Sequence, residues 1–168
     1  MMPSLLHQLD KLPTTGMITY AGEHISVAEL IKRAGEIRQQ YPQFHQLTIA
    51  VYYTNLAEFI TALIAFDGWC SAIYLCPPDV SIPKKELIKW PLEDGVADSD
   101  LVKNQHDVAS LDVTQTSWYM ATSGTTGEPK WFSHSLLSLI TSTKYSQQLQ
   151  FLCWALLYQP FRFAGLQV

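Results

Sequence analysis

The segment from Thr122 to Lys130 holds the residues of this chain that are best suited to chemistry. Two glycines let its backbone turn tightly and bring N–H groups close to a ligand, and four hydroxyl side chains can donate hydrogen bonds. The lysine at its end adds a positive charge. Such a loop suits phosphate oxygens. We therefore predict a phosphate-binding site formed by Thr122, Ser123, Gly124, Thr125, Thr126, Gly127 and Lys130.

The glycine spacing of this loop differs from that of the Walker A loop, G-x-x-x-x-G-K-[ST]. Two residues, not four, separate Gly124 from Gly127, and Lys130 stands two positions further on than the Walker lysine. An ordinary P-loop phosphotransferase is therefore disfavoured. A surface turn whose hydroxyls bond only to nearby backbone remains an equal alternative on composition alone.

The elements that must position the loop are a strand at Ser117–Thr122 and a helix from Ser133 to about Gln148. Open α/β sheets bind nucleotides where a strand passes into a helix at the carboxyl ends of the strands. His134 is a candidate general base, but the sequence offers no Ser, Cys or Asp partner for it at the spacing of a catalytic triad. We assign it a structural role at the helix start.

The first part of the chain alternates helix and strand. Ser26 with Glu29 forms a capping box, in which the serine oxygen and the glutamate side chain each satisfy a free backbone N–H, and Asn55 with Glu58 repeats the signal. The predicted elements are a helix from Ser26 to about Gln40, a strand at Leu47–Tyr53, a helix from Asn55 to a stop at Asp67-Gly68, and a strand at Ser71–Cys76. This rhythm indicates a parallel sheet with helical crossovers.

Three further segments complete the pattern. We expect a short helix at Pro83–Trp90 and an apolar strand at Phe151–Tyr158. Residues 93–112 carry six acids against one lysine and read as a solvated connecting loop. Calcium binding is the alternative, but the acids lack EF-hand spacing.

The octapeptide Ser123–Lys130 resembles the S-G-T-T-G-x-P-K motif of the adenylate-forming superfamily, which contains acyl- and aryl-CoA synthetases, adenylation domains of peptide synthetases, and luciferases. The resemblance covers essentially the whole chain. It extends to Ile25–Ala34, to Phe66–Pro77, to Ser133-His134 and to Pro160–Leu166. Two parts of the chain depart from the family pattern. Trp131 replaces the customary glycine after the lysine, and Arg162 with Phe163 occupies the neighbourhood of the family's acyl-pocket histidine.

The resemblance implies a three-layer α/β fold with a mostly parallel sheet and an enzyme that joins a small carboxylic acid to coenzyme A or to a phosphopantetheine carrier protein through an acyl-AMP intermediate. ATP and Mg²⁺ would be its cofactors. Residues 1–168 would be the N-terminal portion of a single AMP-binding domain, with the rest of that domain and a small lid domain following Val168. Because the family's catalytic lysine lies in that lid, no catalytic residue is assigned, and we expect the chain alone to be inactive.

Composition narrows the range of partners. Eleven basic residues, scattered along the chain, against 15 acidic ones give a net charge of −4, which argues against binding nucleic acid or an anionic membrane surface. Charged residues make up only 15% of the chain, against a usual share of about 25%. Some apolar surface is therefore expected to contact protein, either a second copy or a different partner. The alternative function is a non-catalytic α/β module that binds a partner through the apolar stretch Leu149–Val168.

The cysteines and the chain start indicate the compartment. Cys70, Cys76 and Cys153 are odd in number and form no C-x-x-C pair, so the sequence supports neither a disulfide framework nor a zinc site. No apolar run reaches the roughly 18 residues of a membrane span, and the start lacks the basic region of a signal peptide. We predict a cytoplasmic protein.

Overall fold

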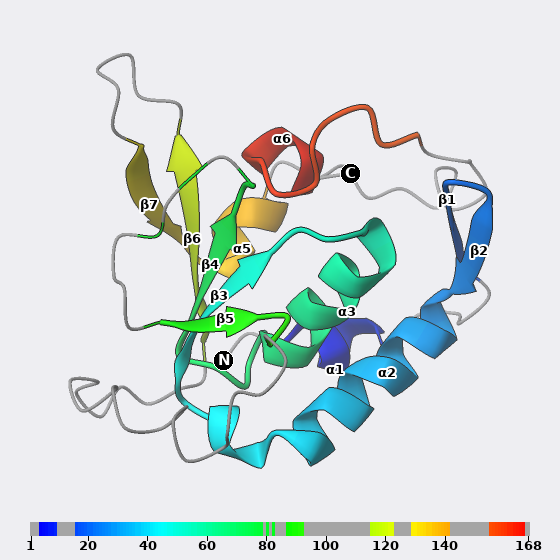
Figure 1. Ribbon diagram of the computed structural model, residues 1–168, viewed down its shortest axis with the longest axis horizontal. Helices are drawn as coiled ribbons and strands as arrows, with labels where there is room; N and C mark the ends of the chain where they lie inside the picture. The colour runs from blue at the N-terminus through cyan, green and yellow to red at the C-terminus, as the bar shows by residue number, and fades with distance from the viewer. Residues whose placement is uncertain are drawn as a thin grey trace.

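The computed structural model describes residues 4–9, 16–78, 80, 82, 87–92, 115–122, 129–141 and 155–166. Its centre is a five-stranded sheet in the order β5-β3-β4-β6-β7 (Figure 1). The strands are β3 (Thr48–Tyr52), β4 (Ala72–Cys76), β5 (Ile88–Trp90), β6 (Ser117–Thr122) and β7 (Lys130–His134). The first four are parallel and β7 is antiparallel to β6, so the predicted mostly parallel α/β sheet is confirmed.

Two helices begin where their caps predict. Before α2 (Val27–Gln40), the Ser26 hydroxyl accepts the Glu29 N–H at 3.1 Å. Before α3 (Leu56–Phe66), the Asn55 side chain accepts the Glu58 N–H at 2.9 Å. The Glu29 carboxylate accepts a hydrogen bond from Arg33 Nε at 2.9 Å, so it is engaged along α2 rather than in the reciprocal half of the predicted capping box.

The core lies between the sheet and these helices. Strand alternation brings Ile49, Ile73 and Trp118 into one row across β3, β4 and β6, and all three are fully buried. The helices gather on this face of the sheet (Figure 1). The third layer expected from the family resemblance stays a prediction, because no described helix covers the opposite face.

Smaller elements surround this core. The hairpin of β1 (Met17–Tyr20) and β2 (Glu23–Ser26) turns at Ala21 and Gly22, which have φ of 52° and 85°, the left-handed values that a two-residue hairpin turn requires. The remaining helices are α1 (Leu5–Leu9), the 3-10 helix η1 (Pro42–Phe44), α5 (Leu136–Ile140) and α6 (Phe163–Leu166).

Buried Asp67 ties α1 to the sheet. Its carboxylate accepts the Leu5 N–H at 2.8 Å and the Trp118 indole N–H at 2.9 Å. Helix α3 ends at Phe66, so the predicted stop at Asp67-Gly68 is confirmed. The same aspartate anchors α1 and β6.

Three sequence predictions are wrong. Ser133 and His134 belong to β7 rather than to a helix, which begins only at Leu136 behind the Ser135 cap. Residues 88–90 form strand β5 on β3, not the end of a helix. Residues 155–158 are irregular rather than strand, and Leu157 is 86% exposed. In the first two cases hydrogen bonds from a neighbouring strand override the local pattern. The predicted segments 83–86, 93–112 and 142–154 lie outside the described residues.

Candidate functional site

The predicted phosphate loop connects the two strands of a hairpin. Thr122, the last residue of β6, is the register partner of Lys130, the first residue of β7, and the Thr122 hydroxyl donates to the Lys130 carbonyl at 3.4 Å. Both residues are exposed. The structure therefore brings together the first and last predicted site residues, whereas Ser123, Gly124, Thr125, Thr126 and Gly127 lie outside the described residues.

This hairpin corrects the predicted strand-to-helix setting. Since β7 begins at Lys130 and the next helix only at Leu136, the helix start predicted at Ser133 is not present to attract an anion through its dipole. Any attraction for an anion must then come from Lys130, from donors of the loop and from other segments that lie near the end of β6.

The hairpin nevertheless leaves the sheet at the edge where α/β proteins bind ligands. β6 runs parallel to β4, and β4 runs parallel to β3, so Thr122 lies at the same edge as the carboxyl ends of both. Figure 1 shows β4 and β6 ending at this edge and β7 beginning there. In open α/β sheets this edge is the usual position of a ligand crevice.

Strand alternation places both loop ends on the helix-covered face. Met120 pairs with Phe132, and the buried Met120 belongs to the core on that face. Thr122 lies two positions after Met120 in β6, and Lys130 lies two positions before Phe132 in β7. Because side chains alternate along a strand, both residues are on the same face of the sheet as Met120.

Arg162 adds a second positive charge near this hairpin and was not among the predicted site residues. Its Nη1 donates to the carbonyl of Ala121, the neighbour of Thr122, at 3.4 Å, and its Nε donates to the Gln159 side chain at 3.4 Å. The sequence singled out Arg162 only as a departure from the family's acyl-pocket pattern. Its position beside β6 depends on a contact across 41 residues, which no local signal reveals.

Trp131 and His134 have structural contacts. Trp131 pairs with Ala121 and packs edge-on against Tyr74 at 5.2 Å, and Tyr74 stacks on Tyr119 at 4.4 Å. His134 pairs with Trp118 in the register, and its ring lies 5.4 Å from that of Phe163. The predicted helix-start position of His134 is wrong, because His134 is the last residue of β7, and its structural role stays a prediction.

The described part of the chain offers little support for a metal site or for a cysteine nucleophile. There, no group of three or more His, Cys, Asp or Glu side chains could hold a metal ion. Burial raises the pKa of the Cys76 thiol to about 12 and that of Cys70 further still, so neither is a ready nucleophile at neutral pH. No described helix has the length and apolar character needed to cross a membrane.

No family model matches the chain, and no curated protein matches it.

Proposed function

We propose that this chain is the N-terminal portion of an ATP-dependent ligase that activates a small carboxylic acid as acyl-AMP and transfers it to coenzyme A or a carrier phosphopantetheine. The observation that carries the proposal is the adenylate-forming-like octapeptide Ser123–Lys130 at the carboxyl edge of a parallel sheet. Its flanking residues Thr122 and Lys130 are exposed and held side by side.

In this reaction a carboxylate oxygen attacks the α-phosphorus of ATP, and the bond to the bridging oxygen of pyrophosphate breaks. Lys130 would stabilise the negative charge that builds on the departing pyrophosphate, and the hydroxyls of Thr125 and Thr126 would hold phosphate oxygens in place. Mg²⁺ supplies further neutralisation of the triphosphate charge. A thiol then attacks the acyl carbon, and AMP leaves.

Arg162 supports the same proposal from a distant part of the sequence. Its guanidinium lies beside Ala121, so β6 ends with Arg162 near one residue and Lys130 paired to the next. Two cations at one strand end favour an anionic ligand over a neutral one.

Calorimetric titration of the 168-residue chain with MgATP tests the proposal. We expect binding that Lys130→Ala weakens about tenfold, the loss of one charged phosphate contact. Lys32→Ala is the matched control, because Lys32 is an exposed lysine on α2 and should leave the affinity unchanged. Equal affinity for all three proteins, or no binding, would contradict the proposed phosphate site.

The catalytic part of the proposal has its own test. The chain alone should not exchange labelled pyrophosphate into ATP, with or without a carboxylic acid, since the lid domain would follow Val168. Carboxylate-dependent exchange by the pure chain would show that the expected division of the enzyme is wrong.

A partner-binding module is the second candidate, and exposed apolar residues near the chain end favour it. Leu157 is 86% exposed, Tyr158 62% and Phe163 43%. This candidate requires a stable complex of fixed stoichiometry in light scattering and no gain of catalysis when the chain is extended.

A further inference from the structure

A groove of about 340 Å³ lies at the opposite end of the sheet from the hairpin. One stripe of α2 forms a wall, because Arg33, Glu36, Ile37 and Gln40 recur at helical spacing. The other lining residues come from α3, from the end of β3 and from the end of β5, and they are Glu58, Thr61, Tyr52, Thr54, Trp90 and Pro91. Its volume matches a small organic ligand.

The apolar part of the groove is held in place by core packing. Trp90 makes edge-to-face contacts with Phe66 at 5.2 Å and with Tyr41 at 5.5 Å, so its indole is fixed while remaining half-buried. The Thr61 hydroxyl donates its proton to the Ala57 carbonyl at 2.8 Å, so toward the groove it can act only as an acceptor. Trp90 and Ile37 thus give the groove a preformed surface for the apolar body of a ligand.

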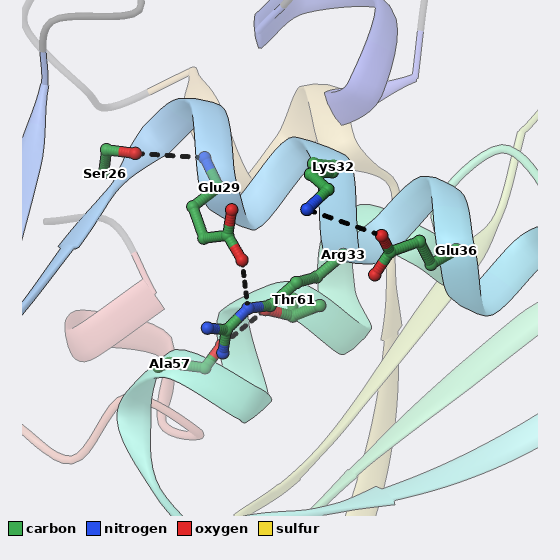
Figure 2. Close-up of polar contacts among 7 residues, drawn as sticks. All are labelled: Ser26, Glu29, Lys32, Arg33, Glu36, Ala57 and Thr61. Carbon is green, nitrogen blue, oxygen red and sulfur yellow. Dashed lines mark hydrogen bonds and ion pairs between the residues drawn. The ribbon is translucent and has the colours of Figure 1, made fainter.

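The charged part of the groove favours a cation. Arg33 reaches from α2 toward α3, and its charge is already paired with Glu29 at 2.9 Å (Figure 2). The ion pair between Glu36 and Lys32 is weak, because Oε1 lies 3.8 Å from Nζ and both side chains are more than half exposed.

Glu58 carries the charge that is least compensated. Its carboxylate accepts a hydrogen bond from the neutral Thr54 hydroxyl at 2.6 Å, and it takes part in neither of the two ion pairs along α2. A carboxylate and a fixed indole that line one groove can together recognise an amine, the first by ion pairing and the second by cation–π attraction or apolar contact.

We propose that this groove binds a small organic cation, an amine whose ammonium group pairs with Glu58 and whose apolar body lies against Trp90. The site is independent of the proposed nucleotide chemistry, because β4 separates β3 from β6 in the sheet.

Three probes of matched size test the proposal. Benzylamine is a cation at pH 7, benzyl alcohol is neutral and benzoate is an anion. By calorimetry, benzylamine should bind more tightly than either comparator. Glu58→Gln should weaken benzylamine about fivefold or more, while Glu23→Gln on the exposed strand β2 should not change it. Equal binding of the three probes, no benzylamine binding up to about 10 mM, or unchanged binding to Glu58→Gln would overturn the proposal.

The indole N–H signals in an NMR spectrum give a second readout that does not depend on affinity. The variant Trp90→Phe assigns the Trp90 signal by its loss. Benzylamine should shift that signal in the unmodified chain, and a shift confined to other indoles would place the amine elsewhere and contradict the site.

Discussion

The β5 end of the sheet is held by side-chain packing, whereas the β7 end is held largely by backbone pairing. Trp90 on β5 contacts Phe44, Phe66 and Tyr41, and the first two of these are fully buried. On β7, Phe132 is 49% exposed, and the strand is held in the sheet by its register with β6. The aromatic side chains at the β5 end therefore contribute mainly to stability, with Trp90 still half-buried in the wall of the proposed amine groove, whereas the β7 end leaves Lys130 exposed to a ligand.

This difference matches the division of roles that we propose. Apolar burial supplies most of the free energy of folding, so the packed end should tolerate little change. Exposed residues at the ends of two paired strands, such as Thr122 and Lys130, can be replaced without weakening the core. Their substitution should therefore change binding much more than stability.

The sharpest test of this contrast uses one substitution at both ends. Phe66→Ala should lower the free energy of unfolding by about 3–5 kcal/mol, because it leaves a cavity among buried rings. Phe132→Ala should lower it by less than about 1 kcal/mol, because half of that side chain is already in water. Urea denaturation followed by circular dichroism measures both. Similar losses at the two sites would remove the contrast.

A smaller effect is expected where Asp67 joins α1 to the sheet. Asp67→Ala leaves the Leu5 N–H and the Trp118 indole N–H without their acceptor, which should lower the free energy of unfolding by about 1–3 kcal/mol. The control Glu23→Ala, on the exposed strand β2, should leave it unchanged. If Asp67→Ala unfolds at the same urea concentration as the unmodified chain, the aspartate does not anchor these elements.

The smallest effect in this series is the pH dependence of the free energy of unfolding that Asp67 causes. Burial raises the pKa of Asp67, so its ionisation costs more in the folded than in the unfolded chain. The protonated carboxyl therefore contributes stability in full below the unfolded pKa, near 3.8, and this contribution is lost as pH rises through the higher folded pKa.

The variant Asp67→Asn isolates the contribution of Asp67 to the pH dependence of stability, because all other carboxyl groups are the same in the two proteins. Relative to Asp67→Asn, the unmodified chain should be more stable at about pH 4 than at about pH 7 in urea titrations. The opposite order would mean that the hydrogen bonds to the carboxylate outweigh its burial.

The helices and strands that surround β5 at the packed end were largely predictable from the sequence, because their signals are local, whereas β5 itself was not, because it depends on pairing with β3. Ser26 and Asn55 cap the predicted helices, Asp67 ends the second one, and the apolar runs around Ile49 and Ile73 form strands. Each of these features depends on neighbours within one or two helical turns, or on a run of apolar residues.

The β7 end was predicted less well, because its structure depends on distant partners. Lys130–His134 is a strand only because β6 offers it hydrogen bonds, and the helical pattern after it begins three residues later than we expected. Arg162 reaches Ala121 across 41 residues. The loop motif itself needed no tertiary information, since its residue types and order identify it in the sequence.

The central claim, that the hairpin between β6 and β7 binds a triphosphate, is tested most directly by amide NMR of the chain titrated with magnesium tripolyphosphate. We predict that the signals of Thr122, Lys130 and the residues between them shift together, with Lys130→Ala reducing the response and the amides of α2 and α3 unchanged. Shifts that spare the hairpin, or that appear only in α2 and α3, would contradict the claim.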